Sequence, residues 1–392
     1  MLKEAISLFD AGYHVNVIWC LISPWADPFD QKLFQQYPTI KWINAGYHSQ
    51  KQPLGYLYAR VRQKYWQLIY RLIGNRFDAA INSLVLYSQE LKSAALKIES
   101  DIFIGHNLGA LPAIVGASKK FSKKNVFDFE DYHRGESGTD TLAFKMIIDV
   151  ENKFIPLIDT ITTASSSITE AYRSIFPQKN YTTIHNVFPL SYAIDEIKHL
   201  PLKPLKLFWF SQYIGKKRGL ENVIQAMATF GQDDIQFTLL GSCSNDIKNY
   251  FSSLADSLGL SKNQIIFIEP IHESKIAQIA SEHHIGIASE PGRDLNNELA
   301  LSNKIMMYLL AGNAILLSNT KMQSEFFQEN TTVGYLYERD SCIALKGALN
   351  FYMNNLHILT EHRSNSLSLA KSKYNWDLEN DIFLKVVGKN IN

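Results

Sequence analysis

Short apolar segments alternate with helix-length amphipathic segments through the second half of the chain. Amphipathic stretches such as 220–230 and 245–258 separate segments that are rich in Ile, Leu, Val and Phe. Strands that alternate with helices in this way form a parallel, doubly wound sheet. The pattern therefore predicts a Rossmann-like α/β domain with strands at residues 205–211, 235–240, 264–268, 285–289 and 314–318.

The first half shows the same alternation, but it begins on a helix. Apolar residues lie at helical spacing from Met1 to Ala11, and Gly12 ends this helix. Because an α/β domain normally begins with a strand, we expect the first strand of this domain to be missing before Met1. A misplaced start codon and a broken copy of the gene both explain such a loss. Further strands are expected at 15–22, 40–43, 101–104, 125–129 and 159–163.

The length of 392 residues favours two domains. Pro201 and Pro204 bracket a polar stretch after the last strand of the first half, which indicates a linker. We expect a first Rossmann-like domain at 1–185, a linker at 186–204 and a second Rossmann-like domain at 205–372. The pattern at 373–392 predicts a helix that crosses back onto the first domain.

The composition indicates the cellular compartment of the protein and argues against one class of partner. The net charge is +1, so no overall electrostatic field favours nucleic acid. Three cysteines without metal-ligand spacing indicate buried free thiols in a reducing compartment. The longest apolar runs, such as 17–22, are far shorter than a membrane span, and no secretion signal is visible. We expect a cytoplasmic protein.

Residues 47–77 differ in composition from the rest. They contain Lys51, Arg60, Arg62, Lys64, Arg71 and Arg76, interleaved with Tyr and Trp, and no Asp or Glu. A basic, aromatic, amphipathic helix can bind an anionic membrane surface, which implies a peripheral protein on the inner face of the cytoplasmic membrane. The alternative is a solvated helix whose aromatic side chains pack on the core.

Polar side chains follow several strands of the first half. His106 lies at the carboxyl end of the strand at 101–104, and Glu130, Asp131 and His133 follow the strand at 125–129. Ligands collect at such strand ends in doubly wound sheets. We therefore expect these residues to line one site.

The second half carries three candidate anion-binding segments. A basic loop at 211–219 contains Arg218 beside a helix start, and Gly241-Ser242 forms a turn after a strand. The stretch 285–319 combines a strand, a polar loop with Glu290 and Glu298, and a helix that begins at Ser302-Asn303-Lys304 and stops at Gly312. A helix N-terminus beyond a strand binds anions, so the stretch predicts an anion site.

Several of these segments resemble the GT-B glycosyltransferases, in particular the retaining group 1 type. The resemblance covers nearly the whole chain. Its first-domain segments are IGHNLGALPAIV with VFDFEDYHRGE, ITTASSSITEAY, and TTIHNVFP at the domain join. Its second-domain segments are LFWFSQYIGKKRGLENVIQAM, SNKIMMYLLAGNAILLSN and KSKYNWDLENDIF.

The resemblance implies two domains that face each other across a cleft, with a nucleotide diphosphate-sugar bound mostly by the second. It implies catalytic roles for His106, Arg218 and Glu290, with Glu130, Asp131 and His133 on the acceptor side. The implied acceptor is a glycan or lipid-linked hydroxyl. Donor contacts are implied for Ser211, Gln212, Arg218, Gly241, Ser242, Glu290, Glu298, Ser302, Asn303 and Lys304.

The sequence departs from the family pattern at two positions of the implied donor site. Gln212 stands where the family has Arg, and Met307 stands where it has a second Glu in the donor helix. Arg218 occupies the position of the family's Lys. Without an arginine at position 212, the negative charge of the diphosphate must be neutralised by Arg218, Lys304 and the helix N-terminus.

The expected reaction is transfer of a sugar to an acceptor hydroxyl with retention, in cell-surface polysaccharide or glycolipid synthesis. No Asp-x-Asp dyad is present, so no metal or cofactor is expected, and the nucleotide-sugar is a substrate. Two other classes stay open. One is a nucleotide-sugar epimerase or sugar phosphorylase, and the other is a degenerate non-catalytic domain that binds a sugar nucleotide or a partner.

Overall fold

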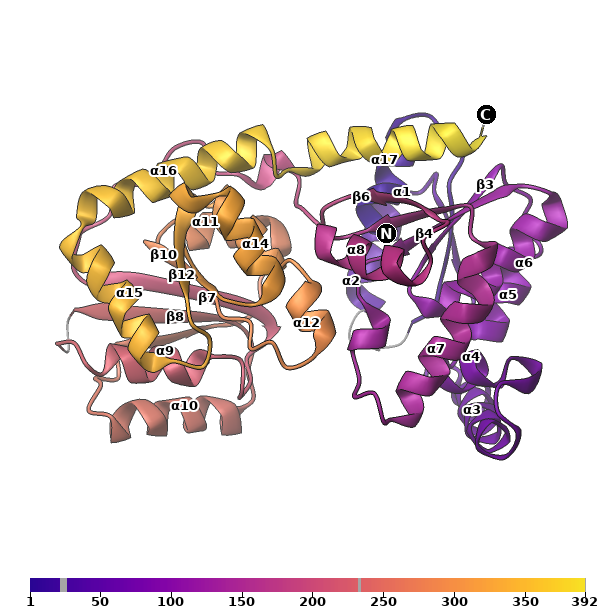
Figure 1. The fold of residues 1–392 in the computed structure, drawn as a ribbon, viewed down its shortest axis with the longest axis horizontal. Coiled ribbons are helices and arrows are strands. Elements are labelled where there is room, and N and C mark those ends of the chain that lie inside the picture. The colour runs from indigo at the N-terminus through magenta and orange to yellow at the C-terminus, as the bar shows by residue number, and fades with distance from the viewer. Residues whose placement is uncertain (22–26, 232–233, 392) are drawn as a thin grey trace. The chain divides into compact units, whose positions relative to one another are not determined.

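A computed structural model describes residues 1–391 except 22–26 and 232–233 (Figure 1). The chain divides into two compact units. The first comprises Met1–Ile184 with Asn380–Asn392, and the second comprises His185–Glu379. Both are α/β units with parallel sheets, so the predicted fold class of two Rossmann-like domains is confirmed.

The second unit contains a parallel six-stranded sheet of order β12-β11-β10-β7-β8-β9. The strand order reverses between β7 and β10, which pair directly. In doubly wound sheets a crevice forms at such a reversal, beyond the carboxyl ends of the two central strands. The strands are β7 (Leu205–Tyr213), β8 (Ile235–Ser242), β9 (Ile265–Ile268), β10 (Ile285–Ala288), β11 (Ala314–Ser318) and β12 (Gly334–Tyr337).

Helices connect these strands and cover both faces of the sheet. A buried core of Leu, Ile, Val, Phe and Trp side chains joins one face to α9, α10 and α15. The helices of this unit are α9 (Leu220–Met227), α10 (Asn245–Ser257), α11 (Ile276–Ala280), α12 (Leu295–Leu299), α13 (Asn303–Leu310), α14 (Lys321–Glu329), α15 (Cys342–Asn354) and α16 (Leu356–Ser372).

The opposite face of β10 is built around one glycine. Side chains alternate between the two faces of a strand. Ile285 and Ile287 therefore point into the core shared with α9, α10 and α15, and Gly286 faces the opposite side of the sheet. The ring of Tyr308 from α13 packs there, and its hydroxyl donates to the carbonyls of Ile287 at 3.1 Å and Phe208 at 3.3 Å. A side chain at Gly286 would therefore collide with α13.

Four details of this unit differ from the prediction. Strand β7 extends through Gln212, and β8 includes Gly241 and Ser242, so neither a loop at 211 nor a turn at 241 follows these strands. The two strands stay paired as far as Tyr213 and Ser242. The polar loop after β10 contains the short helix α12, which Asp294 caps. The edge strand β12 was not predicted.

The first unit has two parallel sheets among its described residues. One pairs β1 (Asn16–Trp19) with β2 (Lys41–Asn44). The other has the order β3 (Ile102–His106), β4 (Lys124–Phe129), β5 (Thr160–Thr163), β6 (Asn180–Thr183). No described strand joins β1 to β3. The strands predicted in this half are present, although the last residue expected in the first one, 22, lies outside the described residues.

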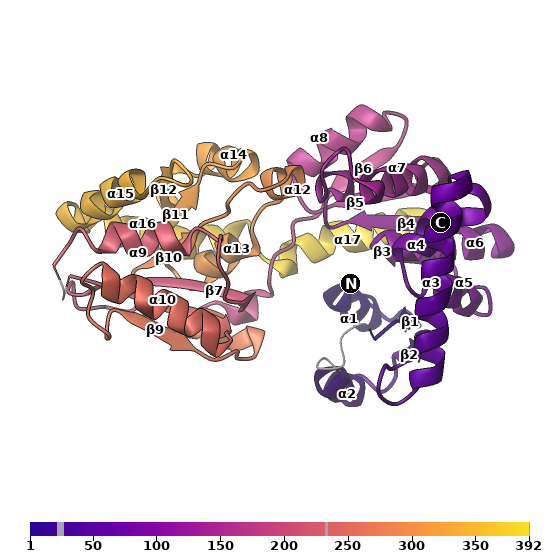
Figure 2. The ribbon, with the colours of Figure 1, turned by 90° about the horizontal axis from the view of Figure 1, so that it is seen from below.

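The helices of the first unit follow the predicted alternation. Helix α1 confirms the predicted N-terminal helix, and α3 is the helix expected within 47–77. Figure 2 shows α3 running beside α4 and α5. The helices are α1 (Leu2–Asp10), α2 (Asp27–Gln36), α3 (Pro53–Ile73), α4 (Ala79–Leu84), α5 (Ser88–Ala95), α6 (Leu111–Phe121), α7 (Leu142–Phe154) and α8 (Ser166–Ile175).

The stretch expected as a linker, 186–204, packs on the second unit. The amide of Ile194 donates to the carbonyl of Leu310 at 3.1 Å, and Arg363 donates to the carbonyl of Lys198 at 3.0 Å. The last helix, α17 (Trp376–Ile391), begins in the second unit and ends in the first. There, Thr160 donates to Asn390 at 3.1 Å.

The structure bears on two expectations from the sequence, the burial of the cysteines and the lack of a membrane span. Cys20, Cys243 and Cys342 are free, but all three are half-buried rather than buried. Across the described part of the chain, none of the helices combines the length and the apolar character required to cross a membrane.

We predict that Gly286→Ala destabilises the protein by at least about 1–3 kcal/mol, the usual range for overpacking. The added Cβ would lie 2.2 Å from Cγ of Tyr308, and that ring is fixed by its two hydrogen bonds. Urea denaturation measures the change.

Gly347→Ala is the matched control, because Gly347 lies within α15 and a Cβ there meets nothing within 4 Å. A helical Gly→Ala change is neutral or stabilising by up to about 1 kcal/mol. Equal stabilities of the two variants would contradict the packing described for Gly286.

Candidate functional site

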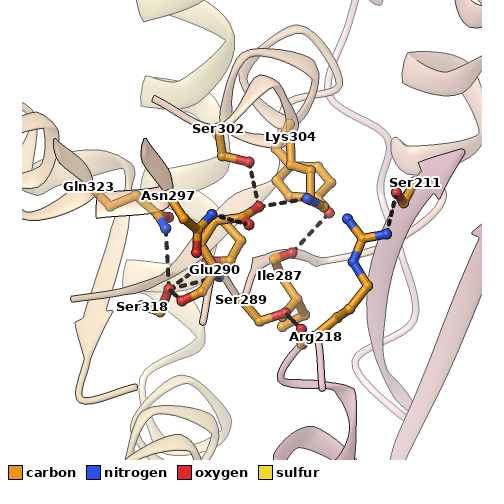
Figure 3. Close-up of polar contacts among 12 residues, drawn as sticks. Ser211, Arg218, Ile287, Ser289, Glu290, Asn297, Ser302, Lys304, Ser318 and Gln323 are labelled. Atoms are coloured by element: carbon orange, nitrogen blue, oxygen red, sulfur yellow. Dashed lines mark hydrogen bonds and ion pairs between the residues drawn. The ribbon is translucent and has the colours of Figure 1, made fainter. Parts of the chain in front are cut away.

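The candidate site lies where the strand order of the second unit reverses. Arg218 precedes α9 shortly after β7, and Glu290 comes two residues after the end of β10. The first turn of α13 brings Ser302 and Lys304 to the same place (Figure 3). Polar residues from three separate segments therefore converge at the position where doubly wound sheets bind ligands.

Glu290 is the centre of this cluster. Its Oε1 accepts hydrogen bonds from Ser302 Oγ at 2.8 Å and from Lys304 Nζ at 2.6 Å. Its Oε2 accepts from Asn297 Nδ2 at 3.3 Å. The backbone amide of Glu290 donates to Ser318 Oγ at 2.8 Å, at the end of β11. Side chains of α12 and of the start of α13 thus fix the carboxylate, and β11 fixes the backbone that carries it.

The charges of this cluster are largely shielded from water. The side chains of Lys304 and Glu290 are only 11% and 13% exposed. Burial alone would raise the pKa of Glu290, but the charge of Lys304 and the hydrogen bonds from Lys304, Ser302 and Asn297 lower it to about 2. Glu290 is therefore ionised at neutral pH and holds the ammonium group in place.

Ser302 occupies the N-cap position of α13, as predicted, but its hydroxyl makes no capping hydrogen bond. It donates to Glu290 instead. At the other end of α13, Gly312 has the positive φ of +60° expected of a glycine beyond a helix end.

Arg218 provides the second cation. Its Nη1 donates to Ser211 Oγ at 2.9 Å and to the carbonyl of Tyr213 at 2.8 Å. Burial lowers the pKa of Arg218 from its ordinary value, yet guanidinium stays charged in proteins. The Arg218 guanidinium and the Lys304 ammonium lie 5.2 and 5.5 Å from the ring of Trp209. Two cations thus share one small region.

A close backbone approach sets the position of Arg218. Ser289 Oγ donates to the Arg218 carbonyl at 2.8 Å, which ties the loop to the end of β10. Gly219 follows with φ of +78°, and a Cβ there would lie 2.8 Å from the Cβ of Ser289. Only glycine fits this contact without strain. Ser289 and Asn297 were not singled out from the sequence, although both flank Glu290 closely.

The other predicted donor contacts lie in different surroundings. Gln212 is exposed on β7, and Asn303 is exposed at the first turn of α13. Gly241 makes room for the carbonyl of Ser211, which a Cβ would approach to 2.3 Å, and exposed Ser242 pairs with Tyr213. These two residues thus serve the pairing of β7 and β8.

Glu298, the other glutamate predicted as a donor contact, makes none of the contacts described for Glu290. Glu298 pairs with Arg339 and accepts a hydrogen bond from the amide of Lys321 at 2.9 Å, at the start of α14. Met307, where the family places its second Glu, is fully buried in α13. A carboxylate at position 307 would have to be desolvated in this apolar helix.

A second cluster surrounds His106 at the carboxyl end of β3. Its Nε2 lies 2.8 Å from Glu4 Oε2, and its Nδ1 lies 3.3 Å from Asp128 Oδ2 and 3.5 Å from Glu130 Oε1. Glu4, on α1, and Asp128, on β4, were not predicted. Glu4 resembles an ordinary acid in the first turn of a helix, and Asp128 lies inside a strand.

Three carboxylates determine the charge of His106. Burial lowers its pKa, but Glu4, Asp128 and Glu130 together raise it well above the ordinary value. An imidazolium is therefore favoured at neutral pH. One ligand-type atom from each of Glu4, His106 and Asp128 lies within 4.8 Å of the other two. However, a metal requires the neutral imidazole, which this charge disfavours.

The remaining acceptor-side candidates follow β4. His133 is buried, and its Nδ1 lies 2.6 Å from Glu136. Its backbone amide donates to the hydroxyl of Tyr172 at 3.2 Å. Asp131 is half-buried, and its charge acts on His133. Glu130 thus joins the His106 cluster, whereas His133 belongs to a neighbouring network.

We predict that Glu290→Gln lowers the free energy of unfolding at pH 7 by on the order of 3 kcal/mol, because the folded protein holds the pKa of Glu290 at about 2. A depressed carboxyl pKa stabilises the fold above the ordinary value of 4.5. That stabilisation disappears as the pH falls towards 2. The stability difference between the two proteins should therefore shrink from pH 4.5 to pH 2, measured by chemical denaturation.

Glu282→Gln is the control, because Glu282 pairs with Lys198 in an ion pair that is exposed on both sides. Such pairs contribute about 0–1 kcal/mol. A pH-independent difference for Glu290→Gln would refute the electrostatic origin of its effect.

Comparisons with known proteins show similarity in structure but not in sequence. The chain matches no protein-family model, and none of the curated proteins matches it in sequence. A glycosyltransferase of Rickettsia africae has a TM-score of 0.68 at 14% identity, over 100% of this chain and 95% of that one.

Two further solved structures contain nucleotides. HepE of Anabaena with UDP-glucose has a TM-score of 0.64 at 13% identity, over 96% of this chain and all of that one. A single-residue mutant of S. aureus TarM, with UDP, fondaparinux and alpha-GlcNAc-glycerol, has a TM-score of 0.70 at 13% identity, over 100% of this chain and 96% of that one. At this identity the likeness concerns the fold, and this chain has the two-unit α/β fold of the GT-B glycosyltransferases.

Proposed function

We propose that the protein transfers a sugar from a nucleotide diphosphate-sugar to an acceptor hydroxyl. The observation that carries the proposal is the pair of cations, Arg218 and Lys304, at the strand-order reversal of the second unit. Clustered cations beside a helix N-terminus suit a diphosphate, which carries more charge than one phosphate group. The structures of HepE with UDP-glucose and of TarM with UDP support the same class of ligand.

The chemistry follows from the charge that develops on the leaving group. As the bond between sugar and diphosphate breaks, negative charge accumulates on the diphosphate. Arg218, Lys304 and the first turn of α13 stabilise that charge, and Glu290 keeps Lys304 in position. Glu290 also retains lone pairs for a sugar hydroxyl, because three side-chain donors among the described residues occupy its two oxygens.

Retention of configuration and independence of metal are further parts of the proposal. The acceptor hydroxyl then approaches from the side of the leaving group, and a donor phosphate oxygen accepts its proton. Arg218 and Lys304 take the place that a divalent cation occupies in other phosphate sites. His106 is then not the base, because its three carboxylate neighbours favour the protonated imidazolium.

A hollow on the first unit supports a glycan acceptor. Its described lining combines the rings of Trp19, Phe34 and Trp42 with several polar side chains, among them Asp27 and Lys51. Rings that offer an apolar face beside groups that form hydrogen bonds suit a small polar ligand. We infer a role in cell-surface polysaccharide or glycolipid synthesis, with a glycan or a lipid-linked glycan as acceptor.

The direct test incubates the protein with UDP-, GDP- and ADP-sugars, with and without a glycan acceptor. A transferase gives product only when the acceptor is present, and NMR of the anomeric proton reports retention or inversion. An epimer formed without acceptor would instead favour an epimerase. The absence of a thermal shift with every nucleotide-sugar would favour a non-catalytic domain.

We predict that Arg218→Ala and Lys304→Ala each weaken binding of the cognate nucleoside diphosphate by about tenfold to a hundredfold, the range for a charged hydrogen bond. Isothermal titration calorimetry measures the binding, and thermal unfolding verifies that each variant is folded. Turnover should fall at least as much, because the negative charge on the diphosphate grows in the transition state.

Lys217→Asn is the matched control in the same loop. Lys217 is exposed and has φ of +59°, which Asn tolerates. Its binding should equal that of the unmodified protein. Unchanged turnover in both the Arg218 and the Lys304 variants would refute the proposed donor site.

A further inference from the structure

Helix α3 exposes an apolar stripe. Leu54 is 81% exposed and Leu72 is 69% exposed, at opposite ends of the helix, and Val61 between them is 60% exposed. Spacings of three and four residues place the stripe on one side of the helix. Its members are Leu54, Leu57, Tyr58, Val61, Tyr65, Leu68 and Leu72.

Polar side chains on the inward side of α3 fix its orientation. Arg62 forms a two-pronged ion pair with Glu90, with distances of 2.7 and 2.6 Å. Gln63 donates to the carbonyl of Ser83 at 3.0 Å, and the hydroxyl of Tyr70 donates to Asp149 at 2.7 Å. A helix at the surface of a water-soluble protein normally has the opposite polarity. Specific hydrogen bonds therefore fix α3 with its apolar stripe outward.

A row of cations borders the stripe. Arg60, Lys64 and Arg71 recur at intervals of four and seven residues, so they lie along one edge of it, and all three are exposed. Within the described chain, none of the three has an ion pair with a carboxylate. The segment 47–77 contains no Asp or Glu at all. The stripe and the row together present an apolar band beside a positive one.

This combination favours a lipid surface over a second copy of the chain. In a two-fold contact the same patch faces itself, so the two basic rows would share one interface without an acid from this segment. An anionic bilayer instead supplies negative headgroups above an apolar layer, and interfacial helices use both.

We propose that α3 is an interfacial helix that binds the protein to an anionic membrane. The helix lies in the plane of the surface, with the stripe at the boundary of headgroups and acyl chains. The basic row contacts the anionic headgroups. This proposal goes beyond sugar transfer and does not depend on it, because it rests on the exposure and charge of α3 alone.

The test is co-sedimentation of the full chain with vesicles at about 0.1 M salt, where surface electrostatics still act. One set is phosphatidylcholine, and in the other roughly one lipid in three is phosphatidylglycerol. We expect binding to the anionic vesicles and much weaker binding to the neutral ones. Equally poor binding to both would overturn the proposal.

Variants of α3 locate the surface. Val61→Asp with Leu68→Asp should abolish binding, because charges enter the apolar stripe. Arg60→Gln, Lys64→Gln and Arg71→Gln together should weaken binding to the anionic vesicles by about a hundredfold, or fivefold for each charge.

Ile343→Asp is the control, because it places a charge at an apolar residue that is 79% exposed on α15, outside α3. Unchanged binding of the double Asp variant, checked for folding by thermal unfolding, would refute the proposal.

Light scattering without lipid tests whether a second copy of the chain covers the stripe instead. We expect a mass that does not depend on the double Asp substitution. A dimer that this substitution dissociates would overturn the proposal and identify the stripe as a contact between copies.

Discussion

The packing of Tyr308 on Gly286 holds the candidate site together. The ring fills the space that the missing side chain leaves on β10, and its hydroxyl bonds the carbonyls of Phe208 and Ile287. Since these carbonyls belong to β7 and β10, one side chain fixes α13 across the strand-order reversal. This packing of α13 sets the positions of Ser302 and Lys304 at the start of the helix. It therefore also allows Lys304 to contact Glu290.

The alternation of apolar and amphipathic segments was sufficient to predict the parallel sheets. Strands buried on both faces, such as β10 and β11, are continuous apolar runs that are easily recognised. The edge strand β12 was missed because it begins with Gly334 and is exposed at Tyr335, so it is not a continuous buried apolar run. The ends of β7 and β8 were misplaced because polar residues stay in pairing as far as Tyr213 and Ser242.

The sequence revealed the residue types of the site better than their partners. Arg218, Glu290 and Lys304 were identifiable because each follows a strand or begins a helix. Their contacts with Ser289 and Asn297, and the contact of His106 with Glu4, depend on how distant segments fold together. The polarity of α3 was similarly hidden, because an amphipathic pattern does not reveal which side of a helix faces the protein.

The ion pair of Lys304 and Glu290 has a consequence for affinity. A free lysine side chain samples many rotamers, and immobilising it opposes binding by up to about 2 kcal/mol. Here the carboxylate and the burial of the stem order the side chain during folding. A phosphate bound as proposed would therefore meet a preorganised ammonium group, and the entropic penalty of ordering the side chain would fall on folding rather than on binding.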